Sequence, residues 1–183
     1  MTASGEALLV IDMQLGFDDP SWGRRNNPDA ERQALRLIRH WRDKRQPLIF
    51  VRHDSPDVAS PLFRGRRGNA FKPGFEICEG DSLITKRVNS AFIGTDLESK
   101  LRQAGIGDLT ILGLTTDQCV STTARMASNL GFATTVVEDA CACFGQTSRD
   151  GVEVSAEVMH LAHMTTLHSE FARVTRASDL LSL

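Results

Sequence analysis

Short apolar runs recur along the chain and alternate with stretches in which apolar residues recur at helical spacing. Residues 6–11 form a nearly continuous apolar run, which is typical of a parallel strand buried on both faces. Next, Ala34, Leu35 and Ile38 follow a helical period after an N-cap and N1 proline at Asn27-Pro28. By the same reasoning, further strands are predicted at 48–53, 82–87, 109–114, 133–140 and 173–176.

Helices are predicted between these strands. Thr95 and Glu98 form a capping box, and Gly105 ends the helix that begins there. The remaining helices are expected at 118–130 and 152–167, with a terminal turn capped by Ser178. Strands that alternate with helices predict an α/β protein, in which helices cover both faces of a parallel sheet. We expect one domain over residues 1–183, because this length is enough to bury a core.

The segment 55–81 does not follow either pattern. It contains several prolines and glycines and is too long for a simple connection in a compact domain, so we interpret it as a lid or binding loop. Arg64, Arg66 and Arg67 lie in this segment and could steer an anionic substrate. The alternative is that they are ordinary solvated loop residues.

Composition and charge indicate which kinds of molecule the protein binds. The formal net charge of −2 argues against nucleic acid, and no apolar window is long enough to span a membrane. The N-terminus lacks the basic start of a signal peptide, so we expect a cytoplasmic protein that acts on a small molecule. The chain has four cysteines, too few for a disulfide scaffold, and we interpret Cys141 and Cys143 as small buried hydrophobic residues.

Three chemically reactive residues lie at predicted strand ends. Asp12 follows the first strand, Lys86 ends the third, and Cys119 lies just past the fourth, where a helix begins. Ligands of parallel sheets bind at the carboxyl ends of strands, so we expect these side chains to meet there. Backbone N–H groups at the helix start, with Lys86 and Asp12, could activate the thiol of Cys119 as a nucleophile. Each residue also has a structural interpretation, as a buried thiol, a turn cap or a solvated charge.

The segments "LLVIDMQLGF", "ITKRVNSAFIGTDLESKLR" and "GLTTDQCVSTTARMASNLGF" resemble the Asp, Lys and Cys motifs of isochorismatase-like cysteine hydrolases, and the similarity covers nearly the whole chain. The resemblance implies a three-layer fold with a six-stranded parallel sheet. It implies that Cys119 attacks a carbonyl carbon, that Asp12 moves the proton and that Lys86 stabilises the charged states. It also implies an oxyanion hole made by the N–H groups of Thr115 and Cys119, with a cis bond between Leu114 and Thr115.

Members of this family usually hydrolyse an amide, carbamoyl or ureido C–N bond through a thioester, and assemble as dimers or larger oligomers. Isochorismatases proper cleave a vinyl ether instead, and this remains an alternative. Nicotinamidases bind a metal through an Asp and two His, whereas here His53 and Asp54 have no second histidine nearby, so we predict neither metal nor cofactor. His53 is then expected in the pocket wall, and Phe17, Trp22 and Phe71 in its roof.

Three rival interpretations remain open. Cys119 and Arg125 fit the C-x5-R pattern of phosphatases, although the intervening "VSTTA" has no glycine and is typical of a helix. Aspartyl-phosphate chemistry at Asp12 would require a second acid where Gln14 stands. The third alternative is a catalytically inactive binding protein of the same fold.

Overall fold

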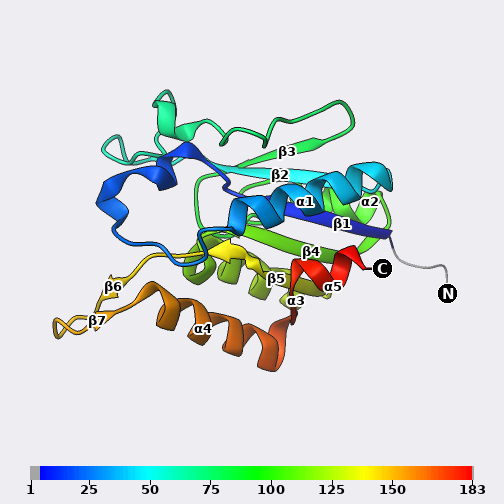
Figure 1. The fold of residues 1–183 in the computed structure, drawn as a ribbon. Coiled ribbons are helices and arrows are strands. Elements are labelled where there is room, and N and C mark those ends of the chain that lie inside the picture. Colours follow the sequence, from blue (N-terminus) through cyan, green and yellow to red (C-terminus); the bar gives the residue numbers. More distant parts are fainter. Residues whose placement is uncertain (1–4, 183) are drawn as a thin grey trace.

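The computed structural model describes residues 5–182, which fold around a six-stranded parallel sheet with strand order β3-β2-β1-β4-β5-β8 (Figure 1). The central strand β1 pairs with β2 and β4, Ile11 lying opposite Val51 and Gly113. All six strands that were expected from sequence therefore belong to one sheet with a single strand direction. The strands are β1 (Gly5–Ile11), β2 (Leu48–His53), β3 (Ser82–Lys86), β4 (Ile106–Leu114), β5 (Ala133–Ala142) and β8 (Arg173–Thr175).

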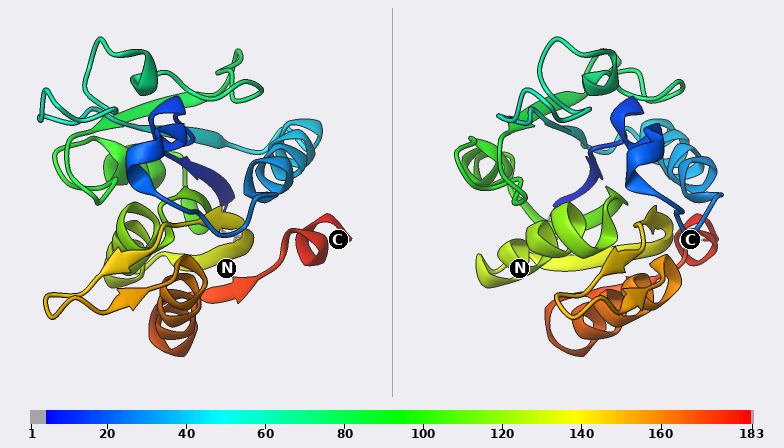
Figure 2. Two further views of the ribbon diagram at one scale, coloured as in Figure 1. Left: turned by 60° about the vertical axis from the view of Figure 1, so that its left-hand side comes forward. Right: turned by 90° about the vertical axis from the view of Figure 1, so that its left-hand side faces the viewer.

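Helices cover both faces of the sheet, so the predicted three-layer α/β fold is confirmed. Helices α1 and α5 pack together on one side, and α2 and α3 lie on the other (Figure 2). Helix α4 packs against β5 and against the turn Thr116–Val120, which leads into α3. The helices are α1 (Ala30–Asp43), α2 (Leu97–Gln103), α3 (Ser121–Asn129), α4 (Ala156–Thr166) and α5 (Ala177–Leu181).

Two helix caps predicted from sequence do not form as expected. Helix α1 begins at Ala30 rather than after Asn27, whose side-chain amide donates instead to the carbonyls of Glu138 (3.1 Å) and Cys141 (2.8 Å). The predicted capping box between Thr95 and Glu98 does not form: the N-cap of α2 is Asp96, and the hydroxyl of Thr95 accepts the N–H of Leu97 at 3.3 Å while donating to the carbonyl of Ala91 at 2.6 Å.

The segment predicted as a helix from residue 152 begins differently. A short antiparallel hairpin, β6 (Gln146–Thr147) with β7 (Glu153–Val154), precedes the helix. Helix α4 starts at Ala156, where the side chain of Ser155 accepts a hydrogen bond from the N–H of Val158 at 3.3 Å. A serine N-cap therefore sets the boundary, and the apolar residues before it belong to the hairpin.

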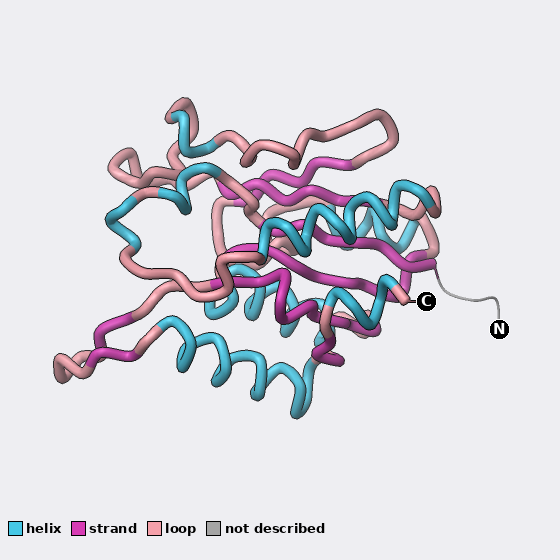
Figure 3. The backbone as a smooth tube through the Cα atoms, in the orientation of Figure 1, coloured by secondary structure: helices cyan, strands magenta, loops and turns pink. Residues whose placement is uncertain are grey.

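The segment between β2 and β3 is irregular, as predicted, except for one 3-10 turn at Arg67–Asn69 (Figure 3). The amide of Asn69 holds this segment in place, donating to the carbonyl of His53 (3.0 Å), the carboxylate of Asp54 (3.0 Å) and the carbonyl of Leu62 (2.8 Å). One buried side chain thus ties the long loop to the carboxyl end of β2.

Gly113 is required where β4 passes β1. Its φ is +132°, and a Cβ atom there would lie 2.0 Å from the backbone oxygen of Ile11. Because that contact is with backbone in the centre of the sheet, we expect Gly113→Ala to lower the free energy of unfolding by about 3 kcal/mol or more. Urea denaturation measures this loss. Gly131→Ala is the matched control: Gly131 also has a positive φ, +83°, but a Cβ atom there would meet no other atom within 4 Å, so the substitution adds backbone strain without a clash. An equal loss of stability in both variants would contradict the steric explanation.

Within residues 5–182, no helix combines the length and apolar character that crossing a membrane requires.

Candidate active site

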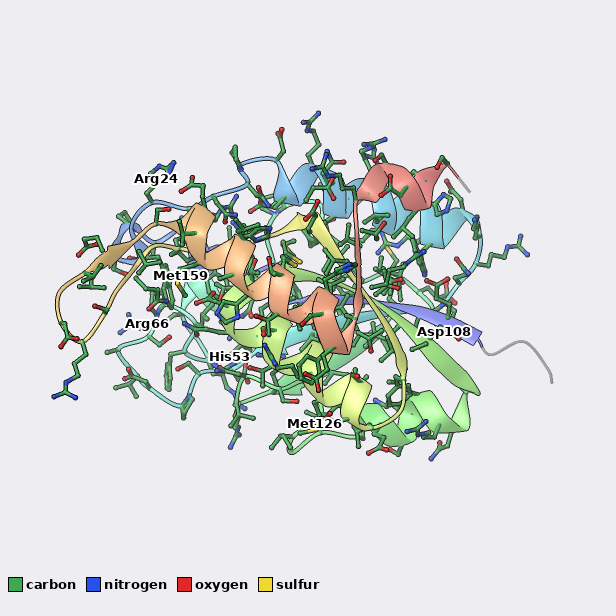
Figure 4. The ribbon with its side chains drawn as sticks, turned by 90° about the horizontal axis from the view of Figure 1, so that it is seen from below. Arg24, His53, Arg66, Asp108, Met126 and Met159 are labelled. Carbon is green, nitrogen blue, oxygen red and sulfur yellow. The ribbon has the colours of Figure 1, made fainter. Side chains whose placement is uncertain are left out.

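The carboxyl ends of four neighbouring strands gather the candidate residues at one edge of the sheet. Asp12 directly follows β1, His53 and Lys86 end β2 and β3, and Cys119 lies five residues past β4. His53 is therefore at the opposite end of the sheet from Asp108, which lies near the start of β4 (Figure 4). The predicted meeting of Asp12, Lys86 and Cys119 at this edge agrees with the positions of their side chains.

The ammonium group of Lys86 is the centre of the site. Its Nζ lies 2.7 Å from Oδ2 of Asp12, 3.1 Å from Nδ1 of His53 and 3.2 Å from Sγ of Cys119. An ammonium has three N–H donors, and here three acceptors surround it. Burial lowers the pKa of Lys86, but Asp12 and Cys119 outweigh this and hold its pKa above the ordinary value, so the group stays charged.

Asp12 is held in an uncommon backbone conformation at the end of β1. Its φ is +48°, in the left-handed region that non-glycine residues rarely adopt, and its N–H donates to the carbonyl of Val51 at 2.9 Å. The side chain is fully buried. Apart from the ion pair with Lys86, neither carboxylate oxygen has a hydrogen-bond partner in the described chain. Asp12 therefore retains free lone pairs beside a thiol and a cation.

The contact with Lys86 fixes the protonation of His53. Because an ammonium can only donate, Nδ1 of His53 must accept, and the ring proton is on Nε2. Burial and the charge of Lys86 both lower the pKa of His53, which favours the same neutral ring. Sequence analysis placed His53 in the pocket wall; the structure adds a direct contact with the ammonium.

Cys119 lies in a single π-helical turn, Thr116–Val120, which leads into α3, and only 6% of the residue is exposed. Its Sγ has Lys86 on one side and Oδ1 of Asn89 at 3.8 Å on another. Burial and the charge of Asp12 raise the pKa of this thiol despite Lys86. With its pKa raised, the sulfur is a thiol that has a carboxylate, Asp12, nearby.

The backbone between β4 and Cys119 turns sharply. The peptide bond between Leu114 and Thr115 is cis, and the Thr115 carbonyl accepts the N–H groups of Gln118 (3.2 Å) and Val120 (3.1 Å). The hydroxyl of Thr115 is buried without a hydrogen-bond partner among the described residues. These contacts fix the turn on which Thr115 and Cys119 present their N–H groups, and the oxyanion hole itself stays a prediction.

Gln14 was not predicted as a site residue; it was noted only because it stands where aspartyl-phosphate chemistry would require a second acid. Its buried amide donates to the carbonyls of His53 (3.1 Å) and Asn69 (2.9 Å), and its oxygen accepts the N–H of His53 at 2.8 Å. The end of β2 is thereby fixed against the end of β1. The signal available in the sequence was a glutamine two residues past a strand-end acid.

The aromatic residues predicted to roof the pocket form two separate groups. Phe17 and Trp22 pack together, with ring centroids 5.4 Å apart, and both pack on Phe144, which sequence analysis missed. Phe71 instead packs edge-on against Phe50 of β2, at 5.8 Å. Phe17 is only 5% exposed, so it supports this cluster from within. Contact of these rings with a substrate stays a prediction.

The geometry does not fit the phosphatase pattern. The guanidinium of Arg125 lies over the ring of Phe171, 4.4 Å from its centroid, and its Nε donates to the hydroxyl of Ser121. The guanidinium of Arg125 is therefore held by Phe171 and Ser121. A C-x5-R phosphate cradle would require this guanidinium at the anion that Cys119 attacks.

The residues also fit a metal poorly. Ligand atoms of Asp12, His53 and Cys119 lie within 4.8 Å of one another, but the ammonium of Lys86 already contacts all three. The other candidate ligand, Asp54, accepts hydrogen bonds from Asn69 and from Arg64 at 3.0 Å each. A metal would have to displace either the ammonium of Lys86 from Asp12, His53 and Cys119 or the guanidinium of Arg64 from Asp54.

A buried cysteine, an acid and a lysine at the strand ends of a parallel α/β sheet define the class of cysteine hydrolases. The Isochorismatase domain model matches residues 6–179, and the chain belongs to the isochorismatase family of hydrolases. It is 39% identical over 177 residues to the isochorismatase family protein YrdC of Bacillus subtilis, covering 97% of this chain and 95% of that protein.

Two further relatives extend this result. Nicotinamidase 3 of Arabidopsis thaliana is 30% identical over 169 residues, covering 85% of this chain and 80% of the relative. The crystal structure of an isochorismatase-family protein from Chromobacterium violaceum superposes with a TM-score of 0.94 at 43% identity, covering 100% of this chain and 94% of that one. The family predicted from the three sequence motifs is therefore confirmed.

Proposed function

We propose that the protein hydrolyses a C–N bond of a small amide, carbamoyl or ureido compound through a thioester on Cys119. The observation that carries this proposal is the contact of one buried ammonium, Lys86, with both the Asp12 carboxylate and the Cys119 sulfur. Similarity to a nicotinamidase, an enzyme of amide hydrolysis, supports the C–N bond over the vinyl ether. The reaction needs no metal, because the residues present supply both the nucleophile and the proton carrier.

The first half of the reaction forms the thioester. Sγ of Cys119 attacks the carbonyl carbon while Asp12 accepts the thiol proton, and the carbonyl oxygen becomes an oxyanion that the N–H groups of Thr115 and Cys119 bind. The C–N bond then breaks. Asp12 returns the proton to the leaving nitrogen, which departs as ammonia or an amine.

The second half restores the free enzyme. Water attacks the thioester carbonyl, Asp12 takes one of its protons, and the C–S bond breaks to release the acid. The departing sulfur regains the proton from Asp12. Over the cycle, one amide and one water become one acid and one amine, and both side chains return to their starting protonation.

Lys86 makes this proton transfer feasible at a thiol whose pKa burial has raised. Before attack, its ammonium balances the carboxylate of Asp12. As the proton moves, negative charge shifts from Asp12 to sulfur, and the same ammonium contacts both atoms. A cation placed between the two sites stabilises the charge before and after transfer, with little rearrangement.

Release of ammonia or amine from a panel of amides, ureido compounds and N-carbamoyl compounds tests this function. We expect turnover of at least one class, unchanged in excess EDTA, since no step uses a metal. A vinyl ether such as isochorismate is the comparison substrate. Hydrolysis of the vinyl ether without any C–N substrate, or loss of activity in EDTA that added metal restores, would contradict the proposal.

A further inference from the structure

A broad hollow of about 540 Å³ lies between the segment that follows β3 and the first turns of α3. It is lined by Val88, Asn89, Ser90, Ile93, Thr122 and Met126. None of these side chains carries a charge, and two of the apolar ones, Val88 and Ile93, are 46% and 49% exposed. By contrast, the cavities lined by the long loop between β2 and β3 contain arginines and acids. Exposed apolar side chains therefore gather around this hollow.

Two of the lining residues contact groups of the candidate active site. Oδ1 of Asn89 lies 3.8 Å from Sγ of Cys119. The ring N–H of His53 donates to the backbone carbonyl of Val88, and the same ring contacts the ammonium of Lys86 at 3.1 Å. The hollow is therefore continuous with the residues that surround the sulfur.

One side of the hollow extends along α3 away from the sulfur. Thr122 and Met126 are three and seven residues past Cys119, a spacing that places side chains on one face of a helix. Helical side chains lean toward the N-terminus of their helix, so the side chain of Met126 leans toward Thr122. At about 1.5 Å per residue, this side extends about 10 Å from Cys119, which is enough for an aryl ring or an alkyl chain.

The opposite side of the hollow is held against α3 by Thr123. The hydroxyl of Thr123 accepts the N–H of Ala91 at 3.1 Å and donates to the carbonyl of Asn89 at 3.5 Å. The hydroxyl of Ser90, a residue only 3% exposed, accepts the N–H of Phe92 at 3.2 Å. Because these bonds already fix this side, a ligand can bind with little loss of conformational entropy.

We infer that the hollow is a subsite that binds an apolar group of the substrate, an alkyl chain or an aryl ring, while the C–N bond lies at Cys119. This rests on the proposed function and narrows its substrate class to amides or ureido compounds that carry such a group. A ligand there removes the exposed apolar surface of Val88 and Ile93 from water, which favours binding. Met126 has a flexible, polarisable side chain that adapts to the shape of an apolar group.

Alkylation of the cysteine thiols tests the subsite without hydrolysis. The reagents are iodoacetamide and N-hexyl iodoacetamide, which both form an S–C bond with loss of iodide and the thiol proton and differ only in the apolar chain. Peptide mapping gives the second-order rate constant at each cysteine, and the exposed Cys78 is the reference thiol in the same chain. At Cys119 we expect the hexyl reagent to react about tenfold faster or more, and at Cys78 within about twofold of iodoacetamide.

Ile93→Gln places a polar amide at the edge of the hollow and is expected to reduce the preference at Cys119 to about threefold or less. Leu161→Gln is the matched control, because Leu161 is also an exposed apolar residue, 66% exposed on α4, but does not line the hollow. We expect this variant to keep the preference of the unmodified protein. Thermal unfolding of both variants checks that the fold is retained.

Equal rates of the two reagents at Cys119, no reaction at Cys119 with either reagent, or equal losses of preference in both variants would overturn the subsite. Sedimentation velocity tests the other occupant of an apolar surface, a second copy of the chain. Dissociation of an assembly by Ile93→Gln, together with equal rates at Cys119, would assign the hollow to that contact instead. A preference for the hexyl reagent at Cys119 without hydrolysis of any C–N substrate would refute the proposed function and leave the apolar subsite standing.

Discussion

Cys119→Ala is expected to lower the hydrolysis rate by about 10⁵-fold or more while leaving the fold intact, because removal of a covalent nucleophile ends the thioester route altogether. The sulfur borders polar groups, with Lys86 at 3.2 Å and Asn89 at 3.8 Å, and alanine keeps the backbone of this turn. Ammonia release measures the loss of activity, and circular dichroism with thermal unfolding measures the fold.

Cys141→Ala is the matched control for this variant. Cys141 is fully buried and its thiol pKa is likewise raised, to about 12, but no ammonium group of residues 5–182 lies beside it. We expect this variant to lose some stability by leaving a small cavity and to keep its activity. Hydrolysis by Cys119→Ala within tenfold of the unmodified protein, or an equal loss of activity in Cys141→Ala, would contradict the assignment of Cys119 as nucleophile.

Lys86→Met is expected to destabilise the protein by about 3–5 kcal/mol and to remove activity. Methionine keeps much of the length and packing of lysine but leaves the carboxylate of Asp12, which is 0% exposed, without its cation. An uncompensated charge in the core is costly, and the sulfur of Cys119 also loses its partner. Urea denaturation gives the loss in the free energy of unfolding.

A double-mutant cycle separates lost charge pairing from lost packing. When Asp12→Asn is combined with Lys86→Met, the buried charge disappears, so we expect the double variant to be destabilised by at least 1 kcal/mol less than the sum of the single losses. Lys72→Met is a matched control: Lys72 is nearly buried, but its partner Glu31 is 22% exposed, so its loss should cost less. If the loss in the free energy of unfolding of the double variant equalled the sum of the two single losses, the interpretation of Asp12 and Lys86 as a buried ion pair would be contradicted.

The fold and the main residues of the site could be predicted from sequence because both depend on local patterns. Continuous apolar runs such as residues 6–11 define buried parallel strands, and strand ends of a parallel sheet lie at one edge. Asp12, Lys86 and Cys119 each stand at or just beyond such an end, so their meeting followed from chain position alone. The distances among them did not follow, because these depend on side-chain conformations.

Features that depend on long-range contacts could not be predicted. Asn27 looked like a helix cap, yet its amide bonds carbonyls of Glu138 and Cys141 more than a hundred residues away, and these tertiary bonds override the local preference. The contact between His53 and Lys86 likewise requires β2 and β3 to pair in one register.

The direction in which the pKa of Cys119 is shifted could not be predicted from sequence, for a related reason. A helix start and a nearby lysine both lower the pKa of a thiol, and both can be anticipated from sequence. Depth of burial and the nearness of the Asp12 carboxylate are properties of the folded chain, and they outweigh the other two. For the proposed mechanism, a raised thiol pKa makes Asp12 necessary as the acceptor of the thiol proton.

Mass spectrometry of the intact protein, quenched with acid during turnover of a C–N substrate, tests the thioester mechanism most directly. The expected result is an added mass equal to the acyl part of the substrate, located by peptide mapping on Cys119 and absent from Cys119→Ala. Turnover with no covalent adduct at any quench time, or an adduct on another residue, would contradict the central claim that the sulfur held by Lys86 attacks the substrate.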